Sequence, residues 1–160
     1  MSFKDAFNVL MLIEGGYQHD PNDLGGETKF GISKRSYPHL DIFNLKIEQA
    51  EAIYYHDFWL LFHLDKVLDS DVATQLLLIV TNCSPQTSGT IVQKAINRVM
   101  GNVKIDGIMG TQTIAAINNV SQLHLEDALR VEMVKFYIHR VSIDKTQKVN
   151  FEGWVRRSML

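Results

Sequence analysis

Residues 14–33 read EGGYQHDPNDLGGETKFGIS, and they directly follow an amphipathic pattern at the start of the chain. The positions on one face of that pattern, at helical spacing, are Phe3, Phe7, Leu10 and Glu14. The spacing predicts a first helix that ends at Glu14. The glycine pair Gly15 and Gly16 then supplies the permissive backbone expected at a helix C-terminus.

The position of Glu14 gives its carboxylate a possible chemical role. We expect the side chain to lie partly against the apolar face, beside the negative end of the helix dipole. Both surroundings disfavour the ionised form, and a carboxyl that stays protonated near neutral pH is what a general acid requires. The alternative is a solvated glutamate at a frayed helix end, and the position alone favours neither interpretation.

The glycine-rich stretch carries four carboxylates, at Glu14, Asp20, Asp23 and Glu27. Glycoside cleavage commonly uses one protonated carboxyl and a second, ionised one. Glu14 suits the first role, and Asp23, or alternatively Asp20 or Glu27, suits the second. Thr28 is a candidate to hold a water molecule through its hydroxyl. Acidic, glycine-rich segments also serve as plain turns, so the pattern favours a glycosidase without being specific to one.

Composition bounds the class of protein. The chain has 160 residues, 46% of them hydrophobic and 21% charged, which fits one soluble domain with a hydrophobic core. The formal net charge of −2 gives no reason to expect binding to nucleic acid or to an anionic membrane. The apolar run 76–80 is too short to span a bilayer, and no signal peptide is visible. We expect a monomer made in the cytoplasm, which needs a separate release route if it acts elsewhere.

The hydrophobic periodicity predicts a mostly helical protein. Lys29–Ile32 is expected to form one strand of a small hairpin, and Pro85 and Gly89 are expected to separate two helices. The predicted helices cover 46–60, 71–80, a segment around 92–99 closed by Gly101, 111–118, a long segment after Ser121 and a short one after Asn150.

Several kinds of site are excluded by the sequence. It contains no HExxH motif and a single cysteine, Cys83, so a zinc site lacks the usual ligands and no intramolecular disulfide can form. Neither the GxSxG motif nor the phosphate-binding GxxxxGK[ST] motif occurs. Counted from Asp20 as an EF-hand loop, Leu24 and Gly31 occupy positions that require oxygen ligands. We therefore expect no metal and no cofactor.

The same residues resemble a known family. EGGY followed by DPNDLGGETKFGIS is similar to the signature of glycoside hydrolase family 108, the N-acetylmuramidases of phage endolysins and their bacterial relatives. The likeness continues through LKIEQAEAIYYHDFW. The later segments IDGIMGTQTIAAIN, FYIHR and GWVRR resemble the peptidoglycan-binding half that usually follows.

The resemblance implies a mostly α, lysozyme-like fold with a small β-hairpin or loop region near residues 17–33. It implies cleavage of the β-1,4 bond between N-acetylmuramic acid and N-acetylglucosamine in peptidoglycan, with action on the cell wall after release. We expect one body over 1–160, made of a catalytic half (1–87) and a peptidoglycan-binding-like half (88–160). Peptidoglycan glycan strands are the implied partner.

The family pattern also implies roles for individual residues. By position, the essential acid is Glu14, and Asp23 is the second catalytic carboxylate, because a spacing of nine residues is similar to that of the acid pair in phage-type lysozymes. Asp20, Glu27, Thr28 and Asn82 are the implied substrate-binding residues. Relatives often carry an Asp-containing segment ending in Val-Asn-Ser-Gly where this chain has LLLIVTNCSPQ, so Asn82 is kept but its surroundings differ.

Two other functions fit the same residues. A lytic transglycosylase uses the substrate's own hydroxyl as the attacking group, and one catalytic glutamate can suffice. A wall-binding or secretion-regulating protein would keep the fold without activity. The identity of the product ends separates the first from a muramidase, and the absence of any cleavage identifies the second.

Overall fold

The computed structural model describes residues 2–19 and 26–159 of the chain. Over these residues the protein is mostly helical with one small antiparallel sheet, which confirms the predicted fold class. No helix in this part of the chain has the length and apolar character needed to cross a membrane. The α-helices are α1 (Phe3–Ile13), α2 (Ile47–Tyr54), α3 (Ser70–Asn82), α4 (Pro85–Val99), α5 (Thr111–Asn119), α6 (Gln122–Ile143) and α7 (Phe151–Ser158).

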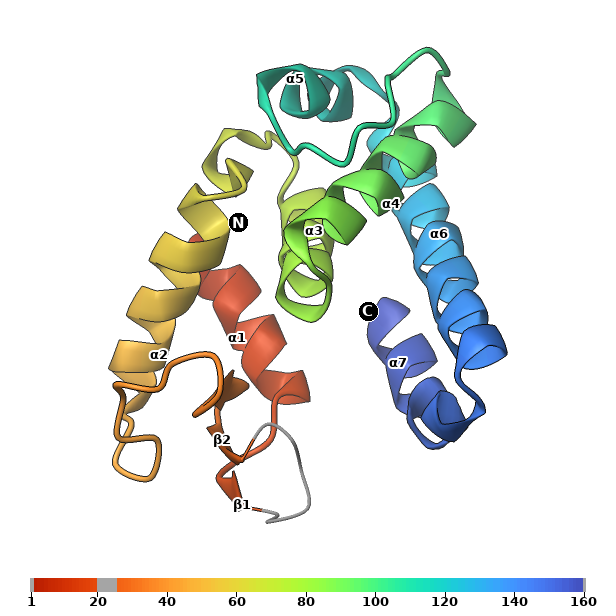
Figure 1. Ribbon diagram of the computed structural model, residues 1–160. Coiled ribbons are helices and arrows are strands. Elements are labelled where there is room, and N and C mark those ends of the chain that lie inside the picture. The colour runs from red at the N-terminus through yellow and green to blue at the C-terminus, as the bar shows by residue number, and fades with distance from the viewer. Residues whose placement is uncertain (1, 20–25, 160) are drawn as a thin grey trace.

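Helix α3 lies in the middle of the molecule, with α1 and α2 on one side of it and α6 and α7 on the other (Figure 1). It contacts α1, α4, α6 and α7. Its side chains from Leu76 to Val80 are all buried, because it is surrounded by other helices. The hydrophobic core is drawn from both halves of the sequence, although the expectation that 1–160 folds as one body stays a prediction.

Helix α4 begins earlier than the sequence predicts. The break between α3 and α4 lies directly before Pro85, as predicted. Pro85 occupies the first position of α4, where its missing N–H costs nothing, and Ser84 caps the helix by accepting from the Thr87 N–H. Gly89 is buried inside the same helix, so the prediction that it breaks the chain is wrong. A Cβ at Gly89 would overlap the carbonyl group of Gly107, so the glycine allows the two backbones to touch.

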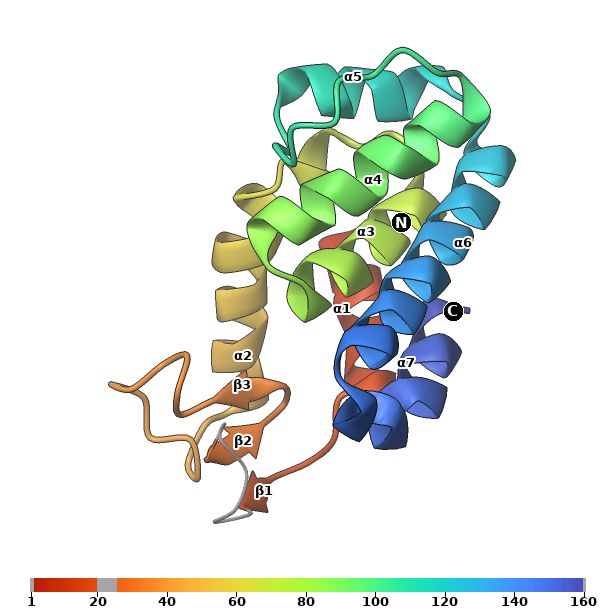
Figure 2. The same ribbon diagram turned by 45° about the vertical axis from the view of Figure 1, so that its right-hand side comes forward.

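The loop that touches α4 is held by one buried amide. Gln93 accepts from the N–H groups of Asp106 and Gly107 at 3.0 and 2.8 Å. Its Nε2 donates to the carboxylate of Asp106 at 2.8 Å and to the carbonyl of Ile108 at 3.1 Å. The loop therefore packs on α4 through its backbone, with α5 directly after it (Figure 2).

The sheet has the order β1 (Gln18–His19), β2 (Glu27–Lys29), β3 (Ile32–Ser33), and both pairings are antiparallel. The predicted strand Lys29–Ile32 is wrong in its bounds, because it contains the turn between β2 and β3. Phe30 and Gly31 have φ values of 52° and 77°, and two successive left-handed residues make the tight two-residue turn of a hairpin.

The end of α1 also differs in detail from the prediction. The helix ends at Ile13, and Glu14 has φ −74° and ψ 128°, which is extended backbone. Gly15 and Gly16 are not among the glycines with positive φ. The extended conformation of Glu14, rather than a left-handed glycine, ends the helix and turns the chain toward β1.

Further along the chain, the predicted helix over 46–60 has the expected extent but two geometries. Helix α2 continues directly into a π-helical segment, Tyr55–Leu60, which is labelled η1. Two short 3₁₀ segments complete the helical structure, η2 (Leu64–Lys66) and η3 (Lys145–Asn150). The last of these leads into α7, which lies beside α6.

Candidate active site

Glu14 lies at the junction between α1 and the sheet. Its backbone N–H donates to the Leu10 carbonyl at 3.0 Å, so the residue is still attached to the last turn of the helix. Phe7 and Leu10, which precede it on the same face, are buried. The Glu14 side chain is 18% exposed, which places its carboxylate at the edge of the core with restricted access to water.

One oxygen of this carboxylate is held by the last helix of the chain. Arg157 of α7 is 21% exposed, and its Nη1 lies 3.2 Å from Oε1 of Glu14. The same Nη1 donates to the side-chain oxygen of Asn82, at the end of α3. The amide nitrogen of Asn82 in turn donates to the Leu78 carbonyl at 2.7 Å. Arg157 therefore connects three elements that are far apart in sequence.

The other oxygen of Glu14 faces the hairpin turn. A Cβ built on Gly31 would lie 2.8 Å from Oε2 of Glu14 and would also overlap the Tyr54 hydroxyl. Tyr54 is buried in α2, and its hydroxyl donates to the Phe30 carbonyl at 2.9 Å. Burial raises the pKa of Tyr54 above its ordinary value, so the phenol is neutral.

The other predicted residues are distributed over the sheet and α3. Glu27 of β2 accepts from the Tyr17 hydroxyl at 2.9 Å, and His19 Nδ1 lies 3.9 Å from the same oxygen. Thr28 is paired with Gln18 and with Ser33, and successive strand residues face opposite sides, so Thr28 faces away from Glu27. Asn82 does not contact Glu14 directly, but the Arg157 side chain contacts both of them.

Two predicted residues, Asp20 and Asp23, lie outside the described residues. The catalytic and substrate-binding roles assigned to all six positions stay predictions. What the structure adds is the neighbourhood of Glu14, namely Arg157, Tyr54 and Gly31.

The sequence carried a weak signal for Arg157. Trp154 and Arg157 are three residues apart and so share one face of a helix, whereas Arg156 does not share it. In the structure Trp154 stacks on Tyr137, and Arg157 is half-buried beside it, while Arg156 is exposed and pairs with Glu152. An arginine on the apolar side of an amphipathic helix indicates a partner in the interior, but not which one.

Two grooves are prominent among the described residues. One, of about 550 Å³, lies between α1 and α7 and is lined by Ile13, Trp154 and Arg157 among others, so it adjoins the Glu14 site. The other, of about 620 Å³, lies between α4 and α6 and is lined by none of the predicted site residues.

A cluster of three carboxylates gives no clear metal site. The oxygens of Asp69, Asp71 and Glu126 lie within 4.8 Å of one another. However, Asp69 caps α3 by accepting from the N–H groups of Asp71 and Val72, and Glu126 pairs with Arg130 at 3.3 Å. The carboxylates of Asp69 and Glu126 therefore already have partners within the protein.

Comparisons with known proteins match two separate parts of the chain. Residues 7–83 match the family model described as Glycosyl hydrolase 108. Residues 88–159 match the model described as Predicted Peptidoglycan domain. A solved structure titled "Structure of Brucella abortus SagA" is 22% identical, with a TM-score of 0.78 over 98% of this chain and 89% of that one, which shows that the fold is shared. No curated protein matches the chain.

Proposed function

We propose that the chain is an N-acetylmuramidase, because residues 7–83 match the Glycosyl hydrolase 108 model and residues 88–159 match the Predicted Peptidoglycan domain model. The reaction is hydrolysis of the β-1,4 bond between N-acetylmuramic acid and N-acetylglucosamine, on the cell wall. The observation that supports this most is the position of Glu14, which is half-buried and held at one oxygen by Arg157.

In the proposed mechanism the two oxygens of Glu14 have different tasks. Oε1 faces the Arg157 guanidinium, a donor that favours an unprotonated oxygen. Oε2 lies next to Gly31, which has no side chain to cover it, so we propose that this oxygen is the one that faces the substrate. This oxygen donates the proton to the glycosidic oxygen as the bond to the muramic acid C1 breaks, and the departing sugar leaves as an alcohol.

A second carboxylate is needed to activate the attacking water or to stabilise positive charge on the sugar. We assign this role to Asp23 first and to Asp20 or Glu27 as alternatives. Glu27 is already bound to the Tyr17 hydroxyl, which fits a residue that contacts substrate at the sheet better than one that attacks. Thr28 and Asn82 are proposed to contact the substrate on the two sides of Glu14.

Arg157 is proposed as a positioning residue. It contacts Glu14 and Asn82 at once, so it fixes the carboxyl relative to α3 as well as to α7. Misplacing a catalytic group by about 1 Å can cost on the order of 10²-fold in rate, so this contact has a direct effect on turnover.

The test is Glu14→Gln assayed on purified sacculi, with the product ends identified by mass spectrometry. We expect kcat to fall by about 10²- to 10⁴-fold, because the amide cannot donate the acid proton but still accepts from Arg157. Glu152→Gln, in an exposed pair with Arg156, is the matched control and should keep wild-type activity. Reducing muramic acid ends support hydrolysis. Anhydro ends would instead identify a lytic transglycosylase, and no cleavage by the wild type would identify a binding protein.

Arg157→Gln extends the same experiment to the positioning role. We expect kcat to fall about tenfold or more with KM little changed, and Arg157→Lys, which keeps the charge, to recover part of the loss. Arg156→Gln, one residue earlier and exposed, should behave as wild type. Equal activity of Arg157→Gln and wild type would contradict the proposed role of Arg157 in positioning Glu14.

A further inference from the structure

The groove between α4 and α6 carries charge of the sign opposite to that of the whole chain. Its lining includes three cations, Lys94, Arg98 and Lys135, and one acid, Glu132, which gives a formal charge of +2 with histidine neutral. The chain as a whole has a formal net charge of −2. A cationic groove on an anionic protein favours the binding of negative ligands there.

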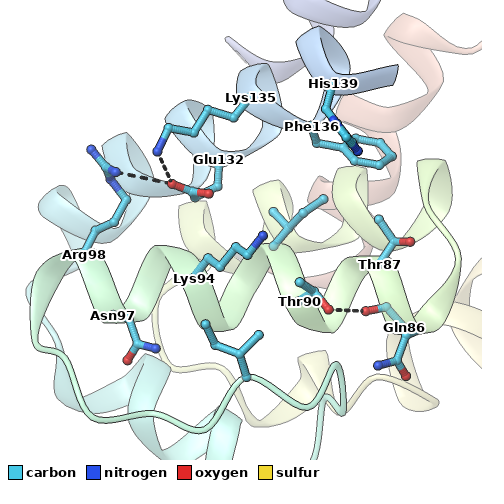
Figure 3. A pocket seen from close by; sticks show the side chains of 12 residues that line it. Gln86, Thr87, Thr90, Lys94, Asn97, Arg98, Glu132, Lys135, Phe136 and His139 are labelled. Carbon is cyan, nitrogen blue, oxygen red and sulfur yellow. Dashed lines mark hydrogen bonds and ion pairs between the residues drawn. The ribbon is translucent and has the colours of Figure 1, made fainter. Parts of the chain in front are cut away.

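The acid in the groove is already neutralised. Glu132 is 9% exposed, and the same oxygen lies 3.3 Å from Arg98 and 3.0 Å from Lys135 (Figure 3). These contacts join α4 to α6, because Arg98 comes from the first helix and Glu132 from the second. The carboxylate therefore serves the packing of the two helices, and two charges of the groove remain uncompensated.

Lys94 is available to a ligand. It is exposed on α4, with its amine turned toward α6 in Figure 3. It makes no hydrogen bond or ion pair with any other residue that the structure describes. In contrast, two polar groups nearer the start of α4 are used internally, since Thr90 donates to the Gln86 carbonyl at 2.8 Å and Gln86 donates to the Asp106 carbonyl at 2.7 Å.

The lining of the groove also includes apolar side chains, next to the polar Thr87, Asn97 and His139. Ile91 is buried beneath it, and the ring of Phe136 lies along the α6 side. The free ammonium group of Lys94, beside an aliphatic and an aromatic side chain, suits a ligand that carries carboxylates on a short peptide with small apolar groups.

We propose that this groove binds the acidic stem peptides of peptidoglycan through their free carboxylates, with Lys94 as the principal contact. This inference rests on the proposed function, which brings peptidoglycan to the chain, and it assigns the peptide and the glycan to different surfaces. A polyphosphate backbone is the less favoured anion, since the net negative charge of the chain opposes binding along a long polyanion.

The test is an NMR titration of the full chain with the tetrapeptide L-Ala-γ-D-Glu-meso-diaminopimelate-D-Ala. We expect shifts confined to residues of α4 and α6 around the groove, and affinity about fivefold weaker for Lys94→Gln, as for loss of one exposed ion pair. Lys94→Glu should weaken binding further, and added salt should weaken wild-type binding. Lys145→Gln, an exposed lysine of η3 outside the groove, is the charge-matched control and should bind as wild type.

Three further outcomes decide the matter. If the wild type cleaves peptide-free glycan strands but does not bind the tetrapeptide, the proposal that the groove binds stem peptides is wrong. The proposed muramidase activity is then unaffected. If the wild type binds the tetrapeptide through Lys94 but cleaves no peptidoglycan, the proposed peptide binding is supported and the proposed muramidase activity is wrong. Equal binding of an amidated tetrapeptide, or tighter binding of a phosphate oligomer at the same residues, would overturn the assignment to peptide carboxylates.

Discussion

Gly31 and Gly89 both allow other groups to approach the backbone closely, but the groups that approach them differ. At Gly31, in the hairpin turn, the neighbours that a Cβ would meet are side-chain atoms, the Tyr54 hydroxyl and the Glu14 carboxyl. At Gly89, inside α4, the nearest neighbour is the backbone of Gly107. Gly31 is exposed and left-handed, whereas Gly89 is buried in regular helix.

This difference separates the proposed catalytic region from a region that stabilises the fold. The surroundings of Glu14 are helix ends, a turn and long side chains, which can shift by rotation about single bonds. The surroundings of Gly89 are a helix interior and a loop fixed by the amide of Gln93, which cannot shift without moving backbone. Substitutions in the first region should change activity more than stability, and substitutions in the second should do the reverse.

The largest effect on stability is expected from Gly89→Ala. The added methyl group overlaps the Gly107 carbonyl, and separating α4 from the loop should lower the free energy of unfolding by about 3 kcal/mol. Urea unfolding measures the change. Gly153→Ala in α7, where a Cβ meets no neighbour, is the control and should raise stability by up to about 1 kcal/mol. If Gly89→Ala leaves the free energy of unfolding unchanged, the loop at Gly107 does not pack closely against α4.

Gly31→Ala should separate activity from stability. Gly31 has φ +77°, so alanine there costs about 1 kcal/mol of strain, while its Cβ displaces the Glu14 carboxyl and lowers kcat by about tenfold or more. Gly26→Ala is closely matched, because Gly26 has φ +66° but a Cβ there meets only the Lys34 side chain at 4.0 Å. We expect Gly26→Ala to cost similar stability and to keep its activity; equal rates for both variants would contradict the proposed role of the turn.

The smallest effect concerns Cys83, between α3 and α4. Burial raises the pKa of its thiol from 9.0 to about 11. The folded state therefore holds its proton more tightly, so this contribution to stability is complete below pH 9 and is lost as the pH rises from 9 to about 11. Cys83→Ala should lose less stability than wild type over that interval in urea unfolding at stepped pH. Identical pH profiles would mean that the thiol ionises as freely in the folded chain as in the unfolded one.

Local patterns in the sequence predicted the elements well. The stripe Phe3, Phe7 and Leu10 is the face that α1 packs inward, and it brings Glu14 to the edge of the core as expected. The helical period depends only on residues that are close together in the sequence, so it can be recognised without knowing the tertiary structure. The extent of α3 and of the helix over 111–118 follows from the same rule.

The failures share a cause, which is contact between distant segments. Gly89 is predicted to break the helix because nothing near it in sequence shows that Gly107 packs against it. Arg157 is 143 residues from Glu14, and no local pattern joins them. The second carboxylate also stays a prediction, since Asp20 and Asp23 lie outside the described residues.

The distance in sequence between Glu14 and Arg157 has a consequence for synthesis. A ribosome adds about 5 to 20 residues each second, so Glu14 emerges on the order of 10 s before its arginine is even translated. Throughout that interval the carboxyl has no guanidinium to align it. A nascent chain stalled before α7 should thus lack the contact that positions its carboxyl, however well its first helices have folded.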